Sequence, residues 1–315
     1  EEDENPMHGL MEVAAIVASE SLDPIPESNL QAAAVVEQLE VGSTRTLKVL
    51  NSLSSISNYE LRDVTLRYAD ENIYIYVDQE VETRNPEDLT DDDIETLASK
   101  FTNQIMPINQ DLFGVESDVN GDERITIYMG PVNNSMSGTG GIVTGFFFPG
   151  DLYDYVSSNQ MEIFYTLVPD SKGLYGPRLS KAFVLNNILP GVLAHEYQHM
   201  ISFNTHVFLF GGSTEKSWLN ESLAHAAEVF TGFSNEIYAR LKLFLQAPNS
   251  TPVVSTGIPT LAERGAGHSF IHYLYEQVID GDNFIRKLLL TDKTGVENIE
   301  AALESSGSRF TTIAD

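Results

Sequence analysis

Residues 192–203 (VLAHEYQHMISF) constrain the fold of this chain more than any other stretch. Apolar residues surround the HExxH motif on every side, which predicts a buried helix. Residues four apart lie about 40° apart around a helix, with Cβ atoms about 5–6 Å apart, so His195 and His199 can bind the same ion. Glu196 lies about 100° further round, where its carboxylate can reach a water molecule on that ion. The motif therefore predicts a metal-binding helix.

A catalytic zinc ion needs a third protein ligand, and the sequence offers one on the next helix. The metzincin pattern HExxHxxGxxH fails here, because Ser202 and Thr205 replace its glycine and last histidine, and His206 lies one residue too far. The segment 218–228 (WLNESLAHAAE) supplies Glu221 instead. Gly211 and Gly212 predict a turn between the two helices, with an N-cap at Ser213 or Thr214.

The sequence LAHEYQHMISF followed by WLNESLAHAAE resembles the gluzincin metallopeptidases, and most of all their bacterial hyicolysin-like family. The resemblance implies that His195, His199 and Glu221 are zinc ligands and that Glu196 is the general base. It is specific over residues 190–232 and looser over 40–310.

Charge and composition exclude several classes of protein. The 315 residues include 46 acidic and 18 basic side chains, a formal charge of −28, which would repel the phosphates of nucleic acids. The absence of cysteine excludes disulfides, thiolate ligands and a cysteine nucleophile. No apolar run approaches the ~20 residues of a membrane span. The chain starts at Glu1, which suggests a processed N-terminus, and we expect a secreted or cell-surface protein of bacterial type.

The segments before the motif are mostly β-type and those after it are helical. This order predicts an α+β, zincin-like fold with a β-rich N-terminal half, a helical C-terminal half and the active-site helix at the cleft. Tyr74 and Tyr76 alternate with aliphatic residues, which suits a sheet with one face covered by helix. Strands are expected at 44–50, 61–68, 72–77, 125–129, 142–148 and 161–168, and helices at 90–109, 235–245, 265–279, 282–290 and 296–304. The predicted domains are 1–85, an N-terminal arm (1–39) with a β-rich segment, and 86–315, a catalytic domain made of a sheet half (86–204) and a helical half (205–315).

Two loops carry alternative interpretations. Asp118, Asn120 and Asp122 occupy positions 1, 3 and 5 of a calcium-binding loop, but Glu123 and Met129 replace its glycine and its final glutamate. An Asn-Gly turn before a strand explains the same residues without Ca²⁺. The glycine-rich loop 138–145 leads into the strand 142–148, which is either an edge strand that binds an extended peptide substrate or a core strand with buried phenylalanines.

Four further residues are candidates for supporting roles in catalysis. His225 lies four residues after Glu221, on the same helix face, where it could orient a ligand, donate to the transition state or fill the core. Glu228, one turn further, is expected to support the site rather than bind the metal. Gluzincins carry a donor tyrosine at the position that Ala262 holds here, so His268 and Tyr273 are the candidate donors.

These features favour a zinc metalloendopeptidase that acts on proteins or peptides, with no nucleic-acid partner. One alternative is an aminopeptidase on the same scaffold, although the chain lacks the Gly-Ala-Met-Glu-Asn-like strand of that group. The other is a surface or binding protein with a retained metal site, although structural zinc sites are usually closed by a fourth ligand, often cysteine.

Overall fold

The computed structural model describes residues 39–53, 58–136 and 141–307. The predicted N-terminal arm and the start of the glycine-rich loop therefore lie almost entirely outside the described residues. The chain divides into two compact units. The first comprises Glu1–Gln104 and Ser117–Glu196, and the second comprises Ile105–Glu116 and Tyr197–Asp315. The division falls inside one continuous helix, α7 (Leu189–Phe203), which carries the HExxH motif.

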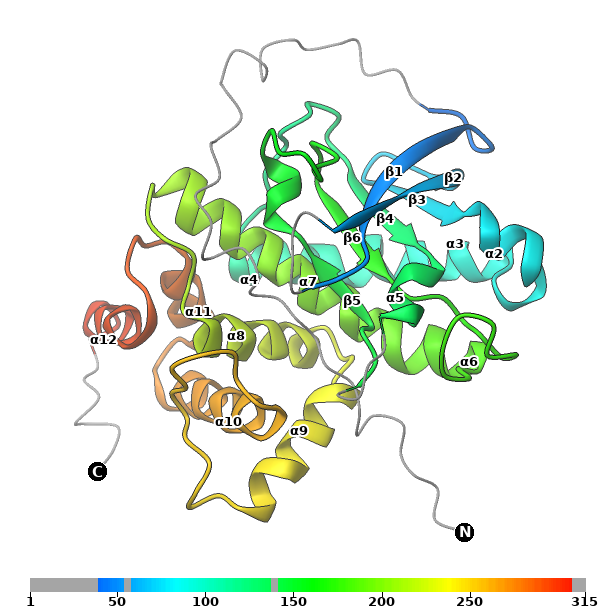
Figure 1. Cartoon of the computed structure of the whole chain (residues 1–315). Helices are drawn as coiled ribbons and strands as arrows, with labels where there is room; N and C mark the ends of the chain where they lie inside the picture. The colour runs from blue at the N-terminus through cyan, green and yellow to red at the C-terminus, as the bar shows by residue number, and fades with distance from the viewer. Residues whose placement is uncertain (1–38, 54–57, 137–140, 308–315) are drawn as a thin grey trace. The chain divides into compact units, whose positions relative to one another are not determined.

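The first unit contains a six-stranded sheet with strand order β1-β2-β3-β4-β6-β5 (Figure 1). Strands β3, β4 and β6 are parallel, whereas β1, β2 and β5 run antiparallel to their neighbours. The strands are β1 (Thr44–Leu50), β2 (Tyr59–Ala69), β3 (Ile73–Asp78), β4 (Ile125–Met129), β5 (Gly145–Phe147) and β6 (Ile163–Thr166). Each coincides with or overlaps a predicted strand. Together with the helical C-terminal half, they confirm the predicted α+β, zincin-like class.

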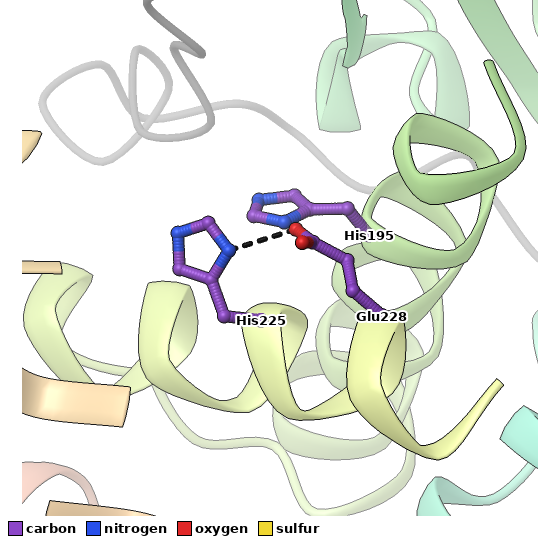
Figure 2. Close-up of side chains that lie close together, drawn as sticks. All are labelled: His195, His225 and Glu228. Atoms are coloured by element: carbon purple, nitrogen blue, oxygen red, sulfur yellow. Dashed lines mark hydrogen bonds and ion pairs between the residues drawn. The ribbon is translucent and has the colours of Figure 1, made fainter. Parts of the chain in front are cut away.

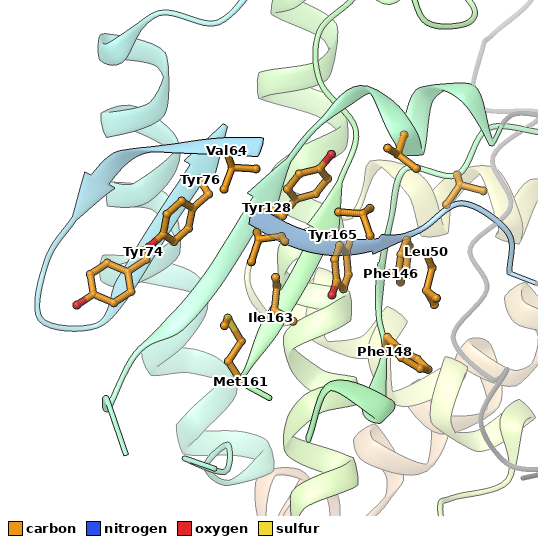
Figure 3. Close-up of a cluster of buried hydrophobic side chains, with 14 of the residues drawn as sticks. Leu50, Val64, Tyr74, Tyr76, Tyr128, Phe146, Phe148, Met161, Ile163 and Tyr165 are labelled. Atoms are coloured by element: carbon orange, nitrogen blue, oxygen red, sulfur yellow. The ribbon is translucent and has the colours of Figure 1, made fainter. Parts of the chain in front are cut away.

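Both faces of the sheet are covered at β3, β4, β5 and β6, whose residues are all buried, whereas β1 and β2 are partly exposed. All six residues of β3 are buried, including Tyr74 and Tyr76. These tyrosines belong to an aromatic and aliphatic cluster with Tyr128, Phe146 and Tyr165 (Figure 3). The Phe146 and Tyr165 rings stack at a centroid distance of 4.7 Å. The tyrosine face is buried because residues of β1, β5 and the following loop pack over it.

The helices of the first unit begin with α2 (Gln79–Arg84) and α3 (Asp91–Lys100). Thr90 and Asp93 form a capping box at the start of α3, at the predicted position. The predicted helix 90–109 continues past its expected end, through a π-helical turn and α4 (Met106–Phe113), and Gly114 follows it with a φ of 109°. The unit also contains the short helices α5 (Pro131–Ser135) and α6 (Lys181–Phe183).

A close approach between β5 and α7 sets the position of the motif. A Cβ atom at Gly145 would lie 2.5 Å from Cγ1 of Val192 and 2.9 Å from the carbonyl oxygen of Tyr165. Only glycine allows this contact. Pro190 lies in the first turn of α7, at the predicted position, and a π-helical turn (Val184–Ile188) leads directly into α7. Strand β5 is therefore held directly against the motif helix.

The second unit is helical. Its helices, in addition to α4 and the C-terminal part of α7, are α8 (Ser217–Phe230), α9 (Asn235–Gln246), α10 (Leu261–Gln277), α11 (Gly281–Leu289) and α12 (Gly295–Ser305). Helix α10 packs against α8, α9 and α11. Among the described residues, the structure contains no helix of the length and apolar character that a membrane span requires.

The turn between α7 and α8 is present, but its N-cap differs from the prediction. Gly211 adopts a φ of 65°, which confirms the predicted turn. The N-cap is Lys216 rather than Ser213 or Thr214. The buried carboxylate of Glu215 accepts hydrogen bonds from the backbone amides of Lys216 and Gly295, both at 2.6 Å. Glu215 thus joins the start of α8 to the start of α12. Helix α8 begins at Ser217, directly after the amide that this carboxylate holds.

Candidate metal centre

Helix α7 places the two histidines of the motif on one buried face. His195 and His199 are one turn apart, and their exposed fractions are 0% and 3%. The helix is unbroken across the division between the units, so helix geometry alone fixes the relative positions of the two rings.

Helix α8 brings Glu221 to the same point. Its Oε1 atom lies 3.7 Å from Nε2 of His199, and the ligand atoms of His195, His199 and Glu221 all lie within 4.8 Å of one another. Two ligand atoms bound at about 2.1 Å in a tetrahedral zinc site are about 3.4 Å apart. The observed spacing is close to this value, and two histidines with a glutamate are a donor set of catalytic zinc sites. The residues therefore fit a zinc ion.

A second group of possible metal ligands shares His195 with the first. It combines His195 with His225 and Glu228, which both project from α8 (Figure 2). Nδ1 of His225 and Oε1 of Glu228 are 2.7 Å apart, which is the length of a hydrogen bond. Two ligands of one zinc ion would be further apart. The geometry therefore favours a hydrogen-bonded pair that supports the site over a second set of ligands.

The carboxylate of Glu196 is held by strand β5. Its Oε2 atom accepts a hydrogen bond of 2.8 Å from the backbone amide of Phe147, and its exposed fraction is 1%. The sequence did not predict this contact. It depends on the Gly145 approach between β5 and α7, and no motif in the chain encodes that approach.

Arg264 on α10 is a second site residue that sequence reasoning missed. Its Nη1 atom lies 2.6 Å from Oε2 of Glu221, and both side chains are 2% exposed. The available signal was an arginine next to glycines inside a helix, at Gly265 and Gly267. Glycine is unfavourable in a helix interior, so its presence there indicates a close approach to a neighbouring element.

The two candidate donors on α10 differ in their surroundings. His268 is buried, and desolvation lowers the pKa of its imidazole to about 4, with a further contribution from His272. Tyr273 is 42% exposed. His268 is one turn after Arg264 and shares its helix face, whereas Tyr273 lies about 180° round the helix from Arg264. Neither belongs to the metal-capable groups found among the described residues.

Tyr197 and His206 lie near the motif in sequence, and each lies close to a glutamate. The hydroxyl of Tyr197 donates a 2.6 Å hydrogen bond to Glu116. Nε2 of His206 lies 3.9 Å from Glu215, and burial lowers the pKa of this histidine. His206 lies in a π-helical turn after α7 and is absent from the metal-capable groups of the described chain.

The loop with the partial calcium pattern satisfies its own backbone. Oδ1 of Asp118 accepts from the amide of Glu123 at 3.2 Å, and Oδ1 of Asp122 accepts from that of Arg124 at 2.8 Å. Asn120 accepts from the amide of Asp122 at 3.1 Å. These contacts agree with the interpretation as an Asn-Gly turn, and no contact in the loop supports Ca²⁺.

Strand β5 has both the edge position and the burial that the two interpretations require, and substrate binding stays a prediction. It is the last strand in the sheet order, and among the described strands it pairs with β6 alone. Phe146, Phe147 and Phe148 are also buried, with exposed fractions of 2%, 4% and 2%. The edge and core interpretations were therefore not exclusive.

Comparison with known proteins finds similarity to one described metalloprotease. No protein-family model matches the chain. The chain is similar to a protein described as neutral metalloprotease ShpI from Staphylococcus hyicus, with 27% identity over 233 residues. The alignment covers 68% of this chain but only 49% of that protein, so the chain spans about half of its length. The chain is thus similar to part of a metalloprotease, and its buried His and Glu groups could hold a metal ion.

Proposed function

We propose that this protein is a zinc-dependent metalloendopeptidase with His195, His199 and Glu221 as the zinc ligands. The observation that carries the proposal is the meeting of these three buried side chains from α7 and α8 at a spacing that fits one ion. A zinc ion bound there would act as a Lewis acid and activate water near neutral pH.

Glu196 is the general base in this proposal. It accepts a proton from the attacking water and passes that proton to the amine that leaves when the peptide bond breaks. The Phe147 amide holds Oε2 of Glu196, which fixes the orientation of the carboxylate without a charged partner in that contact. His268 is the better candidate for a transition-state donor than Tyr273, because His268 shares the helix face of Arg264.

Strand β5 is the proposed docking edge for an extended peptide. Thr144 accepts from the amide of Leu167 at 3.0 Å, so the pairing with β6 uses the backbone of alternate residues. The backbone carbonyls of Gly145 and Phe147 and the amide of Gly145 consequently point away from β6, toward the side where a substrate strand would add, while the amide of Phe147 is taken by Glu196. The acidic chain favours neutral or basic substrates, and we propose a secreted or cell-surface location of bacterial type.

The decisive experiment compares wild type with Glu196→Gln. We expect both proteins to bind about one zinc ion per chain, and only the wild type to cleave casein or an N-acetylated peptide library. Glu162→Gln is a matched control, because Glu162 is also a buried glutamate of the first unit and instead accepts hydrogen bonds from Ser117 and Val119. The control should retain activity.

Three results would contradict the proposal. Equal cleavage by Glu196→Gln and wild type would show that Glu196 is not the general base. Cleavage restricted to peptides with a free amino terminus would indicate an aminopeptidase. Zinc bound by a wild-type protein that hydrolyses nothing would indicate a binding protein.

A further inference from the structure

The two oxygens of the Glu221 carboxylate face different partners. Oε1 lies 3.7 Å from Nε2 of His199, on the side of the metal-capable group. Oε2 lies 2.6 Å from Nη1 of Arg264. Arginine stays charged at all relevant pH values, so a permanent cation is buried against one oxygen of this carboxylate.

Glycines in α10 allow the arginine to reach this depth. A Cβ atom at Gly265 would lie 2.4 Å from the carbonyl oxygen of Arg240 on α9, and one at Gly267 would lie 2.3 Å from Oγ of Ser222 on α8. A side chain at Gly265 would push α10 away from the backbone of α9, and one at Gly267 would displace the Ser222 hydroxyl. The close approach of α10 to α9 therefore depends on Gly265, the residue that follows Arg264.

We propose that Arg264 is a positioning residue that restricts Glu221 to one oxygen, Oε1, as a metal ligand. A carboxylate with no partner on its second oxygen can bind a metal through both oxygens, or rotate away from it. Arg264 opposes both motions because its guanidinium holds Oε2 in a buried ion pair. The role deepens the proposed function and rests on it, since it requires that Glu221 bind the metal.

The test measures metal binding by zinc-free protein rather than activity alone. Arg264→Met removes the guanidinium and keeps a long side chain, and Arg264→Lys keeps the charge without the planar group. The matched control is Arg240→Met, because Arg240 is a buried arginine of the same unit that pairs with Glu236. Zinc affinity is measured by competition with a chelator, and the visible spectrum of each Co²⁺-substituted protein reports the number of ligands.

Arg264→Met should bind zinc about 10–100-fold more weakly than Arg240→Met, the range typical for loss of a residue that orients a ligand. The cobalt spectrum of Arg264→Met should lose the intensity of a four-coordinate site. The zinc affinity of Arg264→Lys should lie between those of Arg264→Met and Arg240→Met. Equal or tighter zinc binding by Arg264→Met, with an unchanged cobalt spectrum, would overturn the positioning role. If Arg264→Met does not fold, the same measurements on Arg264→Lys test the proposal. A wild-type zinc affinity in Arg264→Lys would then overturn the positioning role of Arg264.

Failure of this inference is distinguishable from failure of the proposed function. A wild-type protein that binds no zinc would refute the proposed function before any variant is compared. A wild-type protein that binds zinc and cleaves peptides, with Arg264→Met equal to Arg240→Met, would refute only the role of Arg264.

Discussion

Replacing Gly265 by alanine should destabilise the helical unit, although alanine is the better helix former. A Cβ atom at this position would lie 2.4 Å from the carbonyl oxygen and 2.6 Å from the carbonyl carbon of Arg240. Ordinary contacts begin near 3.4 Å, so the backbones of α9 and α10 must separate by about 1 Å. Overpacking costs about 1–3 kcal/mol, and a contact with backbone should lie at the upper end. The helix propensity of alanine offsets about 1 kcal/mol. The net loss should be about 2 kcal/mol.

The free energy of unfolding in urea, measured on zinc-free protein, checks this value. Gly257→Ala is the control, because a Cβ at Gly257 would meet no atom within 4 Å. The control should stay within about 0.5 kcal/mol of wild type. Gly265→Ala should also bind zinc more weakly, since the shift of α10 carries Arg264 away from Glu221. A Gly265→Ala protein as stable as the control would refute the close approach of α9 and α10.

Two other side chains give predictions of their own. Burial raises the pKa of Asp151 to about 7, against an ordinary value near 4, so the folded state holds this proton more tightly than the unfolded state. Its contribution to stability is present below about pH 4 and is lost as pH rises through 7. Wild type should therefore lose stability relative to Asp151→Asn between pH 5 and pH 8 in urea unfolding, and a constant difference would contradict the assignment. Glu228→Gln weakens the hydrogen bond that orients His225 and should reduce zinc affinity about tenfold in chelator competition. Unchanged affinity would assign His225 and Glu228 to the core alone.

The sequence predicted the fold best where local patterns determine the structure. The alternating tyrosines identified β3, the capping box at Thr90 identified the start of α3, and Pro190 marked the first turn of α7. The motif spacing placed His195 and His199 on one helix face. These predictions succeeded because each depends on residues within about one or two turns of one another.

The sequence could not predict contacts that depend on how elements pack. Phe147 is 49 residues from Glu196, and its contact is made by a backbone amide, which carries no sequence signature. Arg264 meets Glu221 because α10 packs against α8 through glycines. The predicted N-cap of α8 was wrong for the same reason, because Glu215 is held in place by the start of α12, 80 residues away.

The partners of Glu196 and Glu221 suit the different roles proposed for these two buried carboxylates. A cation beside a carboxylate opposes its protonation, whereas a neutral amide opposes it less. Glu196 must accept a proton during the proposed reaction, and its contact at Oε2 is the neutral amide of Phe147. Glu221 must stay charged to bind a metal, and its contact at Oε2 is the permanent cation of Arg264. These two contacts agree with the proposed roles of Glu196 as base and Glu221 as ligand.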